Sequence, residues 1–187
     1  IDTNIPIQSK SGDISDVNVS KNLISTKPDM IFHLAAIVSG QAEQEFDLGW
    51  DINAKGSWGL FEAIRQQGKD YCPRLIFTSS IAVFGAPFPD KISDDFFTTP
   101  LTSYGAQKAI SELLLADYSR KKMIDGVSIR LPTICVRPGK PNLAASGFFS
   151  GIIREPLNGQ VAILPVNPDV RHWHATPRAA AGFLVHA

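Results

Sequence analysis

The chain has 187 residues, of which 44% are hydrophobic, and this length and composition suit one domain with a packed core. Eighteen basic residues balance 18 acidic ones, which argues against a nucleic-acid-binding surface and against an acidic tail. There is no signal peptide and no apolar run of about 18 residues, so we expect a cytoplasmic protein that makes no contact with a membrane. Cys72 and Cys135 lack metal-ligand spacing, which predicts two free thiols and no metal site.

The first half of the chain predicts strands separated by helices. After a polar start, a short helix is predicted over residues 22–25. Residues 30–36 are almost continuously apolar, which is typical of a strand in a parallel sheet that is covered on both faces. A loop over 38–43 leads into a long helical pattern that ends at Gln67, with Gly68 as a plausible C-cap.

The second half continues this alternation. We expect a strand over 75–78, an irregular segment over 83–100 and a helix over 104–118 that is capped by Ser103. A third strand is predicted over 127–131. The remaining predictions are an irregular segment over 132–147, a helix over 148–157, a short strand over 161–164 and a final helix that begins at Thr176 and Pro177.

This order of elements predicts an α/β protein with a Rossmann-like, doubly wound parallel sheet. Ligands of such sheets bind beyond the carboxyl ends of the strands. The three predicted strands lead into Ala35-Ala36, Ser79-Ser80 and Pro132-Thr133. We therefore expect one site against all three strand ends.

Tyr104 and Lys108 lie four residues apart on the predicted helix, so that their polar groups can point into the same space. Such a pair often arises by chance on a protein surface. A nearby ammonium group favours the tyrosinate and brings its pKa toward the range where it can accept a proton. With a strand-end serine to hold a substrate oxygen, the three residues can exchange a proton with an alcohol.

Several motifs together resemble the extended short-chain dehydrogenase/reductase family, specifically its NAD-dependent epimerase/dehydratase group. Thr78-Ser-Ser-Ile-Ala-Val-Phe-Gly85 resembles the serine motif of this family, and Tyr104 and Lys108 match its Tyr-x-x-x-Lys pair. Asn53 resembles the helix asparagine that supports the active-site helix. The resemblance implies that Ser80, Tyr104, Lys108 and Asn53 form the catalytic set.

Other motifs resemble the cofactor-binding segments of this family. The resemblance implies NAD as the cofactor, with NADP not excluded, because the glycine-rich loop that would distinguish them is expected upstream of Ile1. The implied cofactor-binding residues are Asp13, Ile14, Leu34, Ala35, Ala36, Asn53, Thr78, Tyr104, Lys108 and Pro132.

The resemblance also implies how the chain is organised. We expect an internal piece of a longer protein that lacks the first βαβ unit and most of the C-terminal substrate lobe. Residues 1–140 would form a partial NAD-binding Rossmann domain, and residues 141–187 the start of the substrate-binding region together with a returning Rossmann helix. A homodimer is expected through the helices over 42–67 and 103–120, which carry Trp50 and Trp58.

The segment 171–178 departs from the nucleotide-sugar members of the family, because Pro177 stands where they usually carry an aspartate. Together with 146–150, it resembles a branch that oxidises a hydroxyl of a small sugar acid such as D-erythronate. The implied substrate-binding residues are Ser79, Ser80, Thr133, Ser146, Arg171 and His174.

Arginine can grip a carboxylate with two parallel hydrogen bonds, which makes Arg171 a candidate anchor, and Arg154 and Arg178 weaker ones. The alternative for Arg171 is a surface ion pair with Asp169. His33 is expected to be buried rather than catalytic. Two further functions stay open: a nucleotide-sugar epimerase or dehydratase, and a non-catalytic dinucleotide-binding regulator.

Overall fold

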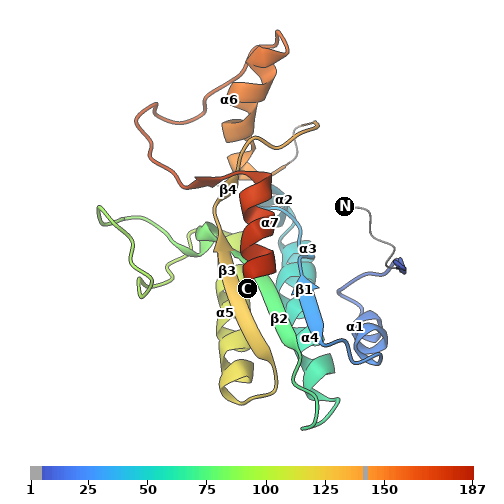
Figure 1. The fold of residues 1–187 in the computed structure, drawn as a ribbon. Coiled ribbons are helices and arrows are strands. Elements are labelled where there is room, and N and C mark those ends of the chain that lie inside the picture. The colour runs from blue at the N-terminus through green and yellow to red at the C-terminus, as the bar shows by residue number, and fades with distance from the viewer. Residues whose placement is uncertain (1–5, 141–142) are drawn as a thin grey trace.

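The computed structural model describes residues 6–140 and 143–187. Its central sheet contains three parallel strands in the order β1 (Met30–His33), β2 (Arg74–Ser80) and β3 (Asp125–Leu131). Strand pairing sets Ser80 beside Leu131, so that the ends of β2 and β3 coincide (Figure 1). The predicted α/β architecture with a parallel sheet is confirmed.

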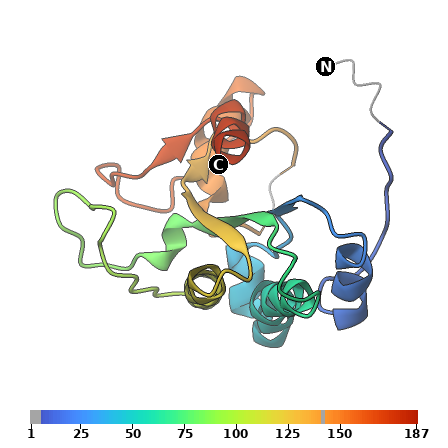
Figure 2. The same cartoon turned by 60° about the horizontal axis from the view of Figure 1, so that its bottom comes forward.

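Helices lie on both sides of this sheet. Figure 2 shows α1 (Val17–Ile24), α4 (Gly56–Arg65) and α5 (Ser103–Arg120) on one face and α7 (Pro177–His186) on the other. The core lies between the sheet and the helices α1, α4 and α5, because the apolar sides of α4 and α5 pack there against β2. It is formed by Ile24, Leu60, Phe61, Ala63, Ile64, Tyr71, Leu75, Phe77, Leu115 and Ile124.

The middle of the segment between β1 and β2 is helical. The loop predicted over 38–43 was wrong, because α2 (Ser39–Gln44) begins there and packs on α5. The helix α3 (Phe46–Gly49) runs through a π-helical stretch (Trp50–Lys55) directly into α4. Gly68 follows with a φ of +98°, a backbone conformation that favours glycine, but the C-cap of α4 is Gln66 and not Gly68 as predicted.

The C-terminal part carries a second, smaller sheet of two parallel strands, β4 (Thr133–Ile134) and β5 (His174–Ala175). Between them lie the 3₁₀ turn Ala145–Gly147 and α6 (Phe148–Leu157), which has the predicted bounds. The strand predicted over 161–164 was wrong. Its residues Val161 and Ile163 are exposed and pair with no described strand.

Helix starts differ in detail from the sequence prediction. The helix α1 begins at Val17, five residues earlier than predicted, because the Asp16 side chain accepts a hydrogen bond from the Asn18 backbone. The cap of α5 is Thr102 and not Ser103, since the Thr102 hydroxyl accepts from the Gly105 backbone. Thr176 caps α7, with Pro177 at the first turn as predicted.

The strand β1 was expected to be covered on both faces, and this was wrong for the described residues. Met30 and Phe32 are 53% and 43% exposed, because α1 and α4 cover only the opposite face and α7 contacts β3. The expected domain boundary at 140/141 adjoins two residues outside the described part, and it stays a prediction. Within 6–140 and 143–187, no helix combines the length and the apolar character needed to cross a membrane.

Candidate active site

A cavity of about 1230 Å³ lies at the carboxyl ends of β1, β2 and β3, where the sequence predicted a site. Its size slightly exceeds the range of roughly 300–1,000 Å³ that is usual for small-molecule sites. Most of the predicted site residues line it: Leu34, Ala36, Thr78, Ser79, Ser80, Tyr104, Lys108, Pro132, Thr133, Ser146 and Arg171. Predicted residues outside the lining are Asp13, Ile14, Ala35, Asn53 and His174.

The serine and the tyrosine meet because α5 approaches the end of β2 very closely. The Ser80 hydroxyl caps the 3₁₀ turn Ile81–Val83 by accepting from the Ala82 backbone at 3.1 Å. At Gly105, next to Tyr104, an added Cβ would overlap the carbonyl oxygen of Ala82. A glycine at this position therefore lets the helix carry Tyr104 to within hydrogen-bonding reach of Ser80.

Lys108 is buried below Tyr104 and is only 1% exposed. Its ammonium donates a 2.8 Å hydrogen bond to the carbonyl of Thr78 and lies 5.7 Å from the centre of the Tyr104 ring. Burial lowers the pKa of Lys108 to about 8. The lysine is thus held at a fixed place at the end of β2, beside the tyrosine.

The pKa of Tyr104 responds differently from the sequence expectation. Burial raises the pKa of Tyr104 above its usual value, and the hydrogen bond with Ser80 partly opposes this rise. The expected lowering by Lys108 is not met in this structure, because the loss of solvation of the tyrosinate has the larger effect. Ser80 is thus the group that favours the tyrosinate here.

Asn53 lies outside the cavity and joins three elements behind it. Its side-chain oxygen accepts from the Ile37 backbone at 2.9 Å, and its nitrogen donates to the Gln107 side chain at 2.8 Å. Asn53 is fully buried in the π-helical stretch. Its partner Gln107 lies on α5, about one turn after Tyr104. Asn53 therefore positions α5 relative to the end of β1, and it does not face the cavity.

His33 is a core residue, as the sequence predicted. It is 3% exposed and shares a 2.9 Å hydrogen bond with the hydroxyl of Ser57. Burial, and to a lesser extent the charge of Lys108, lowers its pKa to about 4. The imidazole is therefore neutral at physiological pH and belongs to the packing beneath the site.

The residues at the ends of β1 and β2 leave room and a free polar group for a bound cofactor. Leu34 and Ala36 provide a small apolar wall beside Tyr104 and Lys108. The buried hydroxyl of Ser79 lines the same space and has no hydrogen-bond partner among the described residues. A buried polar atom of this kind is usually satisfied by a ligand or water.

The predicted cofactor-binding residues Asp13 and Ile14 lie apart from this cavity. Asp13 accepts hydrogen bonds from the backbone and hydroxyl of Ser15, which lower its pKa. Ile14 packs against Gly56 at the start of α4, where an added Cβ would lie 3.1 Å from the Ile14 side chain. Their role in cofactor binding stays a prediction.

The other wall of the cavity comes from the C-terminal part. The Thr133 hydroxyl and the His172 ring are 2.8 Å apart, and His172 stacks on Phe149 with ring centres separated by 4.6 Å. His172 and Trp173 line the cavity, whereas the predicted His174 is exposed and packs on the edge of Phe149. The strand β5 begins only at His174, so His172 and Trp173 precede it, and strand alternation does not decide which ring faces the cavity.

Cationic side chains outnumber carboxylates around the cavity. The lining contains Lys91, Lys108, Arg137 and Arg171, and its carboxylate is Asp90. Arg171 is exposed and forms no ion pair with Asp169 or with another described residue. Such a balance favours an anionic ligand.

Sequence reasoning missed Arg137 and did not assign His172 to the cavity. Both lie in or beside irregular segments, and no periodicity shows which way they point. Within the described ranges, no three His, Cys, Asp or Glu side chains gather in a way that could hold a metal ion. Cys72 and Cys135 are free thiols, as predicted.

The chain is similar to known proteins over most of its length. A sequence model of the NAD dependent epimerase/dehydratase family matches residues 4–175. The chain is 53% identical to a D-erythronate dehydrogenase of Cupriavidus necator, over 94% of this chain and 54% of that protein. A D-erythronate dehydrogenase of Haemophilus influenzae is 48% identical, over 88% of this chain and 52% of the relative.

One solved structure is similar over nearly the whole of this chain. It is described as a nucleoside-diphosphate-sugar epimerase from Agrobacterium tumefaciens, with 62% identity and a TM-score of 0.89 over 95% of this chain and 52% of that one. The chain thus spans about half the length of the curated relatives that it matches.

Proposed function

Since the chain belongs to the NAD dependent epimerase/dehydratase family, we propose that its protein is an NAD-dependent dehydrogenase that oxidises a hydroxyl of a small sugar acid. The two D-erythronate dehydrogenases, at 53% and 48% identity, support this substrate class. The observation that carries the proposal is the cavity itself, which joins the Ser80–Tyr104–Lys108 set to a wall rich in cations.

Each member of this set has a distinct task. Ser80 holds the reacting hydroxyl of the substrate beside Tyr104, and Tyr104 accepts the proton as the alcohol becomes a carbonyl. The hydrogen bond to Thr78 fixes the Lys108 ammonium near Tyr104, where it would also contact the ribose of the cofactor. Leu34, Ala36, Thr78 and Pro132 would hold NAD, which would supply the hydride acceptor.

A substrate screen tests the proposal. Sugar acids of four to six carbons and UDP-sugars are offered to the protein with NAD, and NADH absorbance is followed. We expect NADH to accumulate with a sugar acid and not with a UDP-sugar. Absence of NADH with every sugar acid would contradict the proposal.

A second candidate is a nucleotide-sugar epimerase, favoured by the 62% identity to the Agrobacterium tumefaciens structure described in those terms. An epimerase returns its cofactor to the oxidised state, so the same screen would show converted UDP-sugar without net NADH. The cationic wall is compatible with a diphosphate as well as with a carboxylate. The absorbance trace therefore separates the two candidates.

The expected homodimer stays a prediction. The outward sides of α4 and α5 support it, because Trp58 and Leu113 are 51% and 68% exposed there. Apolar residues exposed on neighbouring helices are suited to pairing with the same surface of a second copy.

A further inference from the structure

The half-buried arginines of this chain divide into two kinds. Arg74, Arg130 and Arg154 each have a carboxylate partner at 2.5–2.9 Å: Asp125, Glu112 and Glu155, respectively. Arg137 has no ion pair with any described residue, although it too is half-buried. Its Nη2 atom is buried and has no hydrogen-bond partner among the described residues.

An unpaired guanidinium nitrogen removed from water is costly, and proteins normally satisfy it. The three paired arginines show that this fold supplies carboxylates to such groups elsewhere. Arg137 instead lines the cavity that contains Ser80 and Tyr104. The missing acceptor is therefore expected to enter from the cavity side.

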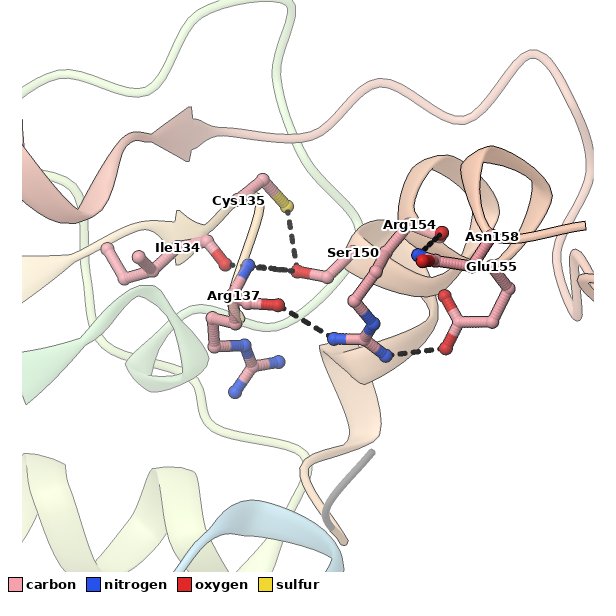
Figure 3. Close-up of polar contacts among 7 residues, drawn as sticks. All are labelled: Ile134, Cys135, Arg137, Ser150, Arg154, Glu155 and Asn158. Carbon is pink, nitrogen blue, oxygen red and sulfur yellow. Dashed lines mark hydrogen bonds and ion pairs between the residues drawn. The ribbon is translucent and has the colours of Figure 1, made fainter. Parts of the chain in front are cut away.

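The backbone of Arg137 is held from two sides by α6 (Figure 3). Its N–H donates to the hydroxyl of Ser150 at 3.0 Å, and its carbonyl accepts from Arg154 at 2.7 Å. The Arg154 guanidinium is in turn fixed by Glu155, and Ser150 is only 1% exposed. Pro138 follows and restricts the backbone of Arg137 further.

Figure 3 shows that the guanidinium of Arg137 points away from the Arg154–Glu155 pair. The scaffold thus grips the main chain of Arg137 and leaves its side chain for another partner. This arrangement differs from that of Arg171, which also lines the cavity but is exposed. An anion at Arg137 would be shielded from water and bound more strongly than one at Arg171.

On these observations, and resting on the proposed function, we infer that Arg137 is the carboxylate anchor of the substrate and determines the preference for an acid over a neutral polyol. The planar guanidinium offers two parallel hydrogen bonds to one carboxylate. Arg171 is then a secondary contact at the mouth of the cavity. A guanidinium would also bind a phosphate of the cofactor. The experiment therefore separates a substrate carboxylate from a cofactor phosphate as the anion at Arg137.

The test compares a sugar acid with the tetritol in which a CH₂OH group replaces the carboxylate. Arg137→Met should raise the KM for the acid by about tenfold to a hundredfold, the range of a charge-assisted hydrogen bond, while kcat falls much less. The acid-over-tetritol preference should fall by the same factor, and Arg137→Lys should lie between. Arg178→Met is the matched control, because Arg178 is exposed and outside the cavity lining, and it should keep the wild-type preference.

Calorimetry with NAD alone distinguishes the two anions. The dissociation constant for NAD should stay within about twofold in Arg137→Met. A large loss of NAD affinity with an intact acid preference would assign Arg137 to the cofactor and overturn the inference, as would an unchanged KM for the acid. Failure of both Arg137 variants to fold would also overturn it, since an unpaired guanidinium has no structural bond to lose. If the wild-type protein oxidises no sugar acid, the proposed function itself fails.

Discussion

The two walls of the cavity differ in how their polar groups are satisfied. On the wall formed by β2 and α5, the chain itself fixes the charged group: Lys108 donates to Thr78, and behind the wall Asn53 bonds to both Ile37 and Gln107. On the C-terminal wall, Arg137 and Arg171 have no carboxylate partner among the described residues. The first wall is built to hold a fixed geometry, and the second is built to receive a charge.

This difference separates the proton-transfer step from the choice of substrate. A proton acceptor must be held in one position, which regular elements with paired polar groups provide. A site for a negatively charged substrate must contain cationic side chains that have no carboxylate partner before the substrate binds. Substitutions on the two walls should therefore affect different kinetic constants.

The largest effect is expected at Tyr104. Tyr104→Phe removes the proton acceptor, so kcat/KM should fall by about 10²–10⁴-fold while NAD still binds. Because burial raises the pKa of Tyr104, the wild-type rate should increase with pH through the alkaline range. Steady-state kinetics across pH measure both, and near-wild-type turnover of the variant would remove Tyr104 from the mechanism.

The burial of the first wall can be tested through His33. Its pKa is about 4 in the folded protein and about 6.5 when exposed, so the unfolded state binds the extra proton between these values. Stability should be highest above pH 6.5 and fall by about 3 kcal/mol as pH decreases to 4, from 1.4 kcal/mol per pKa unit. Urea titrations of the wild type and of His33→Gln measure this slope, which the variant should lack. Equal slopes would mean that His33 is accessible to protons.

Asn53→Ala sharpens the distinction between a catalytic and a positioning residue. It leaves the Ile37 N–H and the Gln107 side-chain oxygen without their partner, which should cost about 1–3 kcal/mol of stability. The KM for the acid should change little, because Asn53 lies outside the cavity. Thermal unfolding measures the first effect, and an unchanged melting temperature would contradict the bridging role.

The smallest effect is expected at Arg171. Since this side chain is exposed, its contact with a carboxylate is worth roughly 0.2–1 kcal/mol, so Arg171→Lys should raise the KM for the acid by at most about fivefold. Turnover at saturation should hardly change. A larger rise in KM than that of Arg137→Met would reverse the order of the two anchors.

The first wall could be predicted from the sequence because its residues lie on regular elements. A strand end placed Ser80, a four-residue helical spacing placed Tyr104 and Lys108, and the alternation of strands and helices gave the parallel sheet. The C-terminal wall could not be predicted in the same detail. Arg137 lies after a two-residue strand, and its orientation depends on contacts with α6, about 13 to 17 residues further along the chain.

The smaller errors have different causes. The run 161–164 has the composition of a strand but finds no partner, and Thr102 rather than Ser103 caps α5 because the helix begins one residue earlier than its apolar pattern. His174 was predicted to bind the substrate, but His172, which precedes β5, lines the cavity instead. For the run 161–164 tertiary contacts override local preference, whereas a local hydrogen bond between Thr102 and Gly105 sets the cap of α5.

The central claim is that Tyr104 and its neighbours serve net oxidation of a sugar acid. The most direct measurement uses an acid deuterated at its carbinol carbons, incubated with the protein and NAD, followed by mass spectrometry of both products. We predict one deuterium on the released NADH for each acid oxidised. Deuterium retained in an acid product with one inverted carbinol carbon, with no accumulation of NADH, would contradict the claim and identify an epimerase.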